Sequence, residues 1–388
     1  MLRCLIDSKW LTAGITGRRL AIIGSYPPPY GGVTTHLMRL SALLDCHGLD
    51  YTIYNTVSRS ADNERVISVC SFRRLWMAWF TLFGRGSCVY VVSQRIAAWL
   101  AGAVMRQWRG KVVAIRLQNT RVLDCLEGGG CRGRIARYAL RHVSAVVCVN
   151  QELATALRRI GVGPERIHMF PGFLPPSAAE QSPQHVDPDV RTFCDAHSPL
   201  IVANGKVAYW RGQDLYGFDQ LILLTERLKS TFPNIGTVIS FWDHLPSDQP
   251  RLNHLVATAR AKGLEKNILF NTTPGLFVPI LDLADVFVRP TVTDGDANSI
   301  REALYLGVPV VASDAVVRPP GTILFRTRDI TDFADKTVQA LRVKRQPISN
   351  TAISEQNTAV ARSEAYLAFL SDLVRSAKSG RNRRAYSI

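Results

Sequence analysis

The sequence predicts an α/β protein that is built from two doubly wound domains with parallel sheets. Apolar runs of strand length alternate with stretches of helical period along the whole chain, which is typical of parallel α/β architecture. A length of 388 residues suits two domains, each with its own core. The alternation is interrupted once, at residues 171–198, where five prolines and little periodicity indicate a linker.

The elements on both sides of this interruption follow from the same pattern. Leu37, Leu40 and Leu44 lie on one face of a predicted helix. The predicted strands are Leu20–Gly24, Cys88–Val92, Val112–Leu117, Ala145–Val149, Leu200–Ala203, Thr237–Ser240, Ile268–Phe270, Val286–Val288 and Val308–Ser313. We place the N-terminal domain at 18–175, the linker at 176–197, the C-terminal domain at 198–355, and a last helix, expected to pack back toward the N-terminal domain, at 356–380.

The positive charge of the chain is concentrated in its first half. The formal net charge is +16, and residues 1–180 hold 23 basic and 10 acidic side chains, whereas the remaining residues hold 24 and 21. Such an excess indicates an anionic partner, which the charge alone leaves open between nucleic acid, a membrane surface and a phosphorylated substrate.

The cysteines and the apolar segments bear on location. Eight cysteines are scattered without a Cys-x-x-Cys pair, so we expect a reducing compartment, no disulfide framework and no metal site. We find no secretory signal, and the longest apolar stretch, Cys88 to Met105, is interrupted by Gln94 and Arg95. We expect a cytoplasmic protein, peripheral to the cytoplasmic face of the membrane.

Three segments carry candidate site residues. The first is the glycine pair Gly31-Gly32, which follows the first strand and precedes a helix. Backbone N–H groups at such a turn can approach an anion, although a rigid connector without a ligand is the alternative. The second is the pair Lys206 and Arg211, which follows the first strand after the linker and could hold a diphosphate, the alternative being a solvated surface loop.

The third segment runs from Asp285 to Asp314 and is predicted to form a strand, a loop, a short helix and a strand. Asp294 is placed on the loop, and Glu302 in the first turn of the helix. Small residues at the start of this helix, around Asn298-Ser299, suit a phosphate at a helix N-terminus, and Glu302 could accept hydrogen bonds from a ribose diol. Alternatively, Ser299 and Glu302 form only a capping box.

Four segments in this order resemble the retaining GT-B glycosyltransferases of the bacterial group-1 (family 4) class. They are IIGSYPPPYGGVTTH, VNQELATALRRIGVGPERIHMFPGFLPP, NGKVAYWRG and DGDANSIREALYLGVPVVASD, and the resemblance extends from about Arg19 to about Phe325. It implies two Rossmann-like domains that face each other across a cleft. The second domain would bind most of the nucleotide-sugar donor, and the first would bind the acceptor.

The resemblance also implies roles for single residues. Lys206 and Arg211 fall on the family's diphosphate pair with Arg and Lys exchanged, and Asp294 falls on the first acid of its Glu-x7-Glu motif, a contact to the donor sugar. These three are the implied catalytic residues. Donor binding is implied for Gly31, Gly32, Asn298, Ser299 and Glu302, the last as the ribose ligand. Where many relatives have a His in the first domain, this chain has Arg116-Leu117-Gln118-Asn119.

The implied function is that of a retaining hexosyltransferase in the synthesis of cell-surface polysaccharide, exopolysaccharide or glycolipid. It would use a nucleotide-diphosphate sugar as donor and need no obligatory cofactor or metal. The alternatives are a GT-B nucleotide-sugar epimerase, which would convert the donor alone, and a catalytically silent relative that binds a sugar nucleotide.

Two segments of the basic half point to a membrane. Residues 72–85 and 94–109 combine Trp, Phe and Arg, and five of the seven tryptophans, Trp10 among them, precede residue 110. Most such aromatic residues belong to a core, but their flanking arginines favour an anionic membrane surface that brings a saccharide acceptor on a lipid carrier. We expect no nucleic-acid partner, because neither stacking aromatics on a basic strand face nor a reading helix is evident.

Overall fold

A computed structural model describes residues 20–57, 63–84, 86–118, 122–170, 172–241, 244–294, 297–342 and 350–378. The chain divides into two compact units. The N-terminal unit contains the chain up to Leu174, apart from Pro29–Gly32, and the residues from Ala361 onward. The C-terminal unit contains Pro29–Gly32 and Pro175–Val360.

The N-terminal unit is built on a parallel seven-stranded sheet in the order β3-β2-β1-β4-β5-β6-β7. Every residue of β1, β2, β4, β5 and β6 is buried, as expected for parallel strands that are covered on both faces. The strands are β1 (Leu20–Gly24), β2 (Tyr51–Asn55), β3 (Val66–Ser68), β4 (Cys88–Val92), β5 (Val112–Leu117), β6 (Ala145–Cys148) and β7 (Ile167–Met169).

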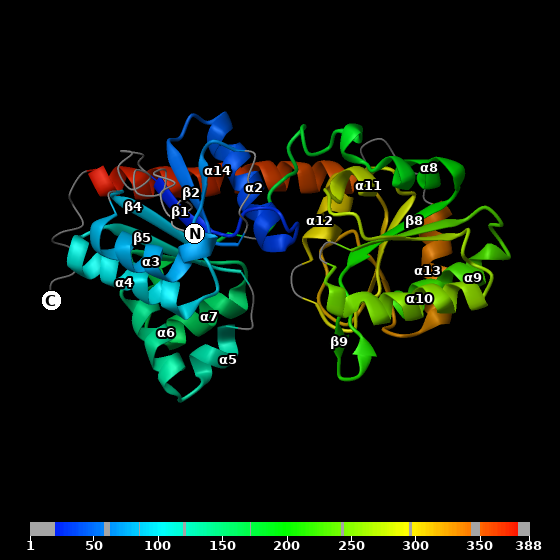
Figure 1. The fold of residues 1–388 in the computed structure, drawn as a ribbon, viewed down its shortest axis with the longest axis horizontal. Coiled ribbons are helices and arrows are strands. Elements are labelled where there is room, and N and C mark those ends of the chain that lie inside the picture. Colours follow the sequence, from blue (N-terminus) through cyan, green and yellow to red (C-terminus); the bar gives the residue numbers. More distant parts are fainter. Residues whose placement is uncertain are drawn as a thin grey trace, which may run out of the picture. The chain divides into compact units, whose positions relative to one another are not determined.

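Two groups of helices cover this sheet (Figure 1). One face packs against α3 (Arg73–Phe83), α4 (Ile96–Arg109), α5 (Val122–Glu127), α6 (Cys131–Arg141) and α7 (Gln151–Arg159). The other face packs against α2 (Gly32–Cys46), through the predicted Leu37, Leu40 and Leu44, and against the C-terminal part of α14 (Asn350–Lys378).

Tyr366 joins α14 to the sheet through a buried polar cluster. Its hydroxyl lies 2.6 Å from that of Tyr90 on β4, and the guanidinium of Arg116 on β5 lies 5.3 Å from its ring centre. Arg116 is fully buried and donates to the carbonyl of Phe170 at 3.1 Å. Arg116, the first residue of the segment Arg116-Leu117-Gln118-Asn119, is therefore part of the support for the C-terminal helix.

The C-terminal unit has a parallel six-stranded sheet in the order β12-β11-β8-β13-β14-β15 and a separate hairpin of β9 and β10. Helices α9, α10 and α13 pack on one sheet face, and α8, α11 and α12 on the other. The strands are β8 (Leu200–Gly205), β9 (Tyr209–Trp210), β10 (Gln213–Asp214), β11 (Gly236–Phe241), β12 (Ile268–Asn271), β13 (Val286–Arg289), β14 (Val310–Ser313) and β15 (Ile323–Phe325). The helices are α8 (Pro188–Ala196), α9 (Phe218–Lys229), α10 (Gln249–Ala261), α11 (Val278–Asp282), α12 (Asn298–Tyr305) and α13 (Ile330–Arg342).

The architecture confirms the predicted α/β class with two parallel sheets, but the predicted linker contains structure. Short 3-10 turns occur at Cys70–Phe72, Pro164–Arg166, Pro183–His185 and Pro246–Asp248, and the third of these precedes α8 within the linker. The carboxylate of Asp187 caps α8 by accepting from the backbone of Asp189, and Pro188 occupies the first turn. The buried Val190 and Cys194 then place one face of α8 in the core.

Replacing Leu370 with Ala is expected to lower the free energy of unfolding by about 3 kcal/mol, because Leu370 is fully buried against the N-terminal sheet and its loss leaves a cavity. Urea denaturation would measure this change. Asp372→Ala is the matched control on the same helix, since this side chain is 68% exposed in an ion pair with Arg375, and its effect should stay within about 0.5 kcal/mol. Equal stability of the two variants would contradict the packing of α14 described above.

Candidate functional site

The strand order of the C-terminal unit creates one position suited to a ligand. From β8 the chain moves through β11 to β12 on one side and then crosses to β13 on the other, so β8 and β13 are neighbours at a topological switch point. Ligands of doubly wound folds bind outside the carboxyl ends of the strands at such a point. Lys206 directly follows β8, and Asp294 lies on the loop that follows β13. The structure thus brings the second and third predicted segments to one sheet edge.

Lys206 and Arg211 lie on different elements. Strand β9 lies between them, and it forms a hairpin with β10 in which Trp210 pairs with Gln213 and Arg211-Gly212 is the two-residue turn. Both cations are exposed, and neither has an ion-pair partner among the residues that the structure describes. Arg211 lies 5.7 Å from the ring centre of Trp210. The hairpin projects from the sheet of its unit (Figure 1).

Arg211 has an unusual backbone conformation. Its φ angle is 49° and that of Gly212 is 78°, so both turn residues are left-handed, which is the type I′ geometry that favours Asn-Gly. A residue with a large side chain costs about 1 kcal/mol or more in this region. Such an observed outlier at an exposed cation favours a functional role for the side chain.

The base of the hairpin is held by Asp214. Its Oδ1 accepts from the backbone of Tyr216 and Gly217 at 3.1 and 3.2 Å, and its Oδ2 accepts from Arg251 at 3.3 Å. Burial, with a smaller contribution from Asp219, raises the pKa of Asp214. Gly217 is the N-cap residue of α9, with a φ angle of 68°, and it faces Pro290 after β13 so closely that an added Cβ atom would overlap the carbonyl oxygen of Pro290.

Asp294 is held by two arginines. Arg289, the last residue of β13, donates to both carboxylate oxygens at 2.9 and 3.2 Å, and Arg318 donates to Oδ2 at 3.0 Å. Burial acts to raise the pKa of Asp294, but the charges and hydrogen bonds of Arg289 and Arg318 outweigh it and hold that pKa below its usual value. The carboxylate therefore stays ionised.

The helix after this loop begins at Asn298, and Ala297 is its N-cap without a side-chain hydrogen bond. The alternative of a capping box between Ser299 and Glu302 is therefore wrong, because Ser299 already lies inside the helix. Glu302 is the fifth residue of α12, just beyond the expected first turn, and is 6% exposed. Ser299 is also buried, whereas Asn298 is partly exposed at the helix N-terminus.

Gly31 and Gly32 lie on the path from β1 into α2, which begins at Gly32. β1 lies between β2 and β4, the switch point of the N-terminal sheet, so this pair has the position in its sheet that Lys206 has in the other. Four residues of the predicted motifs, Asn119, Pro171, Gly295 and Asp296, lie outside the described residues.

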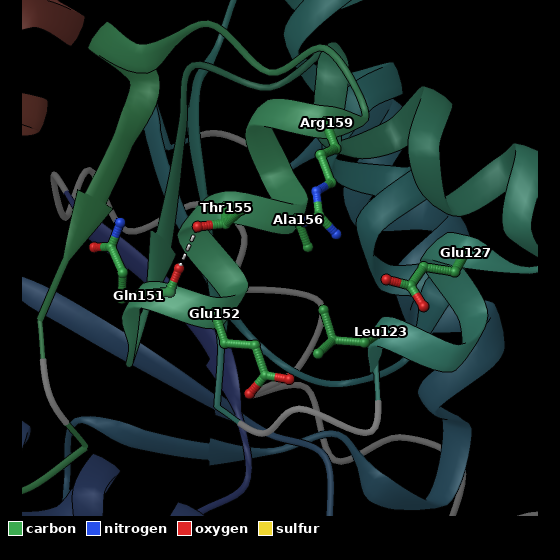
Figure 2. Close-up of a pocket in the computed structure, with 7 residues that line it drawn as sticks. All are labelled: Leu123, Glu127, Gln151, Glu152, Thr155, Ala156 and Arg159. Atoms are coloured by element: carbon green, nitrogen blue, oxygen red, sulfur yellow. Dashed lines mark hydrogen bonds between the residues drawn. The ribbon is translucent and has the colours of Figure 1, made fainter.

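A hollow that the sequence analysis did not predict lies beside α7 in the N-terminal unit. Figure 2 shows its charged side chains, Glu127 from α5 and Glu152 and Arg159 from α7. The hollow has a volume of about 240 Å³. Thr155 donates to the carbonyl of Gln151 at 2.9 Å along the same wall. The sequence did contain an indication of this region, because α7 lies within VNQELATALRRIGVGPERIHMFPGFLPP, the second of the four segments that carry the resemblance. The other lining residues are Leu123 and Ala156.

Comparison with known proteins agrees with these observations. The family pattern described as glycosyl transferases group 1 matches residues 245–342, which include Asp294, Asn298, Ser299 and Glu302. No curated protein sequence matches the chain significantly.

Several solved structures share the fold over most of the chain. HepE from Anabaena, solved with UDP and glucose, is 15% identical with a TM-score of 0.62, covering 91% of this chain and 99% of HepE. Sucrose-phosphate synthase from Thermosynechococcus elongatus is 15% identical with a TM-score of 0.60, over 95% and 100%. The lipopolysaccharide outer core galactosyltransferase WaaB is 12% identical with a TM-score of 0.54, over 94% and 99%. The fold is thus of the GT-B type, and the resemblance to group-1 glycosyltransferases is confirmed.

Replacing Gly217 with Ala should destabilise the protein by about 3 kcal/mol or more, since backbone strain is joined by overlap with Pro290. Gly212→Ala is the matched control, because its φ angle of 78° is as strained but no atom lies within 4 Å of the added Cβ, so about 1 kcal/mol is expected. Thermal and urea unfolding of both variants would measure the difference. Similar losses would contradict the close approach of Gly217 to the loop after β13.

Proposed function

We propose that this protein is a retaining glycosyltransferase that moves a sugar from a nucleoside-diphosphate sugar to a saccharide acceptor carried on a lipid. The observation that carries the proposal is the meeting of two segments at the switch point of the C-terminal sheet. One supplies Lys206 after β8, and the other supplies the loop and helix N-terminus after β13. Positive groups from both segments suit an anionic diphosphate.

Each chemical group of the nucleotide-sugar donor has candidate binding residues in this protein. Lys206 and Arg211 would hold the diphosphate from one side, and the N-terminus of α12 at Asn298 and Ser299 would hold it from the other. Glu302 would accept from the ribose hydroxyls. Gly31 and Gly32 would bring backbone N–H groups toward the diphosphate. The structures of HepE with UDP and with UDP-glucose support UDP as the first nucleotide to test.

The chemistry follows from where charge develops. When the bond between the anomeric carbon and the donor phosphate breaks, negative charge grows on the leaving diphosphate, and Lys206 and Arg211 would stabilise that charge. The acceptor oxygen would attack from the face that the diphosphate leaves, which retains the anomeric configuration. The proton of the acceptor hydroxyl would pass to the leaving phosphate oxygen.

The acceptor would bind to the N-terminal unit. The hollow beside α7 offers carboxylates of Glu127 and Glu152 as acceptors and the guanidinium of Arg159 as a donor, a combination that suits sugar hydroxyls. That WaaB acts on the lipopolysaccharide outer core supports a lipid-borne saccharide and a role in cell-surface polysaccharide synthesis.

One helical face of the N-terminal unit suits the membrane that would carry such an acceptor. Helices α3, α4 and α6 contain eight arginines and no acidic residue, and α4 packs against both neighbours. Leu75, Phe83 and Trp108 on this face are 73%, 62% and 76% exposed. Exposed apolar side chains among arginines favour docking on anionic lipid headgroups.

Not all residues of the two predicted membrane segments are on the surface. Trp76 and Trp99 are buried in the core, as most aromatic residues at helical spacing are. Arg85 and Trp10 lie outside the described residues. None of the helices in the described part of the chain is long and apolar enough to cross a membrane.

Calorimetric titration with UDP, GDP and ADP, followed by product analysis with the matching sugar donors, tests the donor proposal. We expect Arg211→Asn to lower turnover roughly 10²–10³-fold, because one charge-stabilising donor is lost. The melting temperature should stay equal or rise, since Asn-Gly suits the type I′ turn.

Arg211→Lys is the matched variant, which keeps the charge and should retain more of the turnover. Normal turnover of Arg211→Asn would remove Arg211 from the site. Conversion of the donor in the absence of any acceptor would instead favour a nucleotide-sugar epimerase, and binding without turnover would favour a silent relative.

Flotation with vesicles tests the membrane proposal. The protein should bind vesicles that contain phosphatidylglycerol and not vesicles of phosphatidylcholine alone. Replacing the exposed Arg74 and Arg109 with Gln should weaken binding roughly 30-fold, at about 1 kcal/mol per charge.

The matched control replaces Arg326 and Arg375, which are each 74% exposed and lie on other elements. It removes the same charge and should bind like the unaltered protein. Negligible binding to both vesicle types, or an equal loss in the control, would reject the face formed by α3, α4 and α6.

A further inference from the structure

The two arginines around Asp294 have no counterpart in the predicted site, and both are buried. The side chains of Arg289 and Arg318 are 5% and 2% exposed, and that of Asp294 is 12% exposed. Burying three ionised groups is costly unless each is paired and hydrogen-bonded, and here the geometry satisfies that condition. Such a cluster is a fixed part of the fold and is too enclosed for the arginines to meet a ligand directly.

Arg289 connects the two segments of the donor site. One edge of its guanidinium holds Asp294, while Nη1 donates to the carbonyl and the Oδ1 of Asn204 at 2.9 and 3.1 Å. Asn204 is two residues before Lys206, and Asp294 is four residues before Asn298. A single side chain thus fixes the ends of β8 and of the loop after β13, and its guanidinium lies 4.9 Å from the ring centre of Tyr216.

Arg318 connects the same loop to the end of a third strand, β14. Its Nε donates to the carbonyl of Ser313, the last residue of β14, at 3.1 Å. Its Nη2 donates to the hydroxyls of Thr291 and Ser313 at 2.8 and 3.2 Å, while Nη1 reaches Asp294. The loop after β13 is therefore fastened at both Thr291 and Asp294 before it enters α12.

We propose that Arg289, Asp294 and Arg318 form a positioning cluster that sets the distance between Lys206 and the N-terminus of α12, and that Asp294 acts through this cluster instead of by contact with the donor sugar. The inference rests on the proposed function and assigns the first acid of the motif a different role. Both oxygens of Asp294 already accept hydrogen bonds from guanidinium groups, so its charge serves to hold the loop after β13 in place.

The effect of Asp294→Asn on ligand binding distinguishes between three hypotheses for this side chain: an electrostatic role, a contact with the sugar, and a positioning role. It raises the net charge of the cluster, so a purely electrostatic role would make UDP bind more tightly. A contact with the sugar would leave UDP affinity unchanged and weaken only UDP-glucose. The positioning role predicts that UDP and UDP-glucose weaken together, by roughly tenfold or more, because misplaced binding groups lose that much.

Arg318→Met should give the same joint loss with a higher KM, and Arg318→Lys should recover part of it. The double variant Asp294→Asn with Arg318→Met restores the net charge of the cluster, and it should bind UDP no worse than the weaker single variant. The double variant also keeps the proposal testable if Asp294→Asn alone fails to fold. It leaves only Arg289 buried without its partner carboxylate, whereas the single variant leaves both Arg289 and Arg318 in that state. Glu226→Gln, which removes a surface ion pair with Lys262 at 2.7 Å, is the control and should change nothing.

Calorimetric titration with UDP and with UDP-glucose provides the readout for every variant. If the unaltered protein binds neither ligand, the proposed donor fails, whatever the cluster does. If it binds both and Arg318→Met binds them equally well, the positioning cluster is refuted while the donor proposal stands. Additive losses in the double variant, or a loss confined to UDP-glucose in Asp294→Asn, would also refute it.

Discussion

The parallel pairing of β8 with β13 is the constraint on which the candidate site depends. More than eighty residues separate these strands along the chain, yet they are hydrogen-bonded neighbours at the reversal of strand order. All loops that follow parallel strands leave at one edge, so this pairing alone places the NGKVAYWRG and DGDANSIREAL segments together. In the proposed donor site, the first of these segments supplies Lys206 and Arg211, and the second supplies the N-terminus of α12.

Under the proposed function, the arginines of the two units have two different roles. In the C-terminal unit, arginines are individually placed: Arg289, Arg318 and Arg251 are buried or half-buried against named carboxylates. In the N-terminal unit, the arginines of α3, α4 and α6 accumulate on one helical face with no acidic residue among them. Individually paired charges fix the positions of neighbouring groups, whereas under the proposed function the accumulated positive charge of the N-terminal unit would attract an anionic membrane.

Much of the fold could be predicted from the sequence, because continuous apolar runs identify buried parallel strands. β1, β4 and β5 have the predicted bounds. The missed strands β3, β7 and β15 have three residues each and lie at sheet edges, where the apolar signal is shortest. The strand β2 was also missed, although it has five residues inside the sheet, because Thr52 and Asn55 interrupt its apolar run. The β9–β10 hairpin was missed because Arg211 occupies a turn position that usually belongs to Asn or Gly. The helix α8 was missed because prolines suggested a linker, although Pro188 sits where a helix tolerates it.

The site was only partly predictable, since the partners of Asp294 are not encoded in its own motif. Arg318 is 24 residues away and joins the carboxylate only because β14 lies beside β13. The same geometry gives a physical meaning to aspartate at a position where the resemblance implies glutamate. A carboxylate that holds its loop against the strand ends gains from a short stem, because each added methylene loosens the distance between loop and strand. The shorter acid is therefore consistent with an anchor, whereas a group that reached out to a sugar would gain from the longer one.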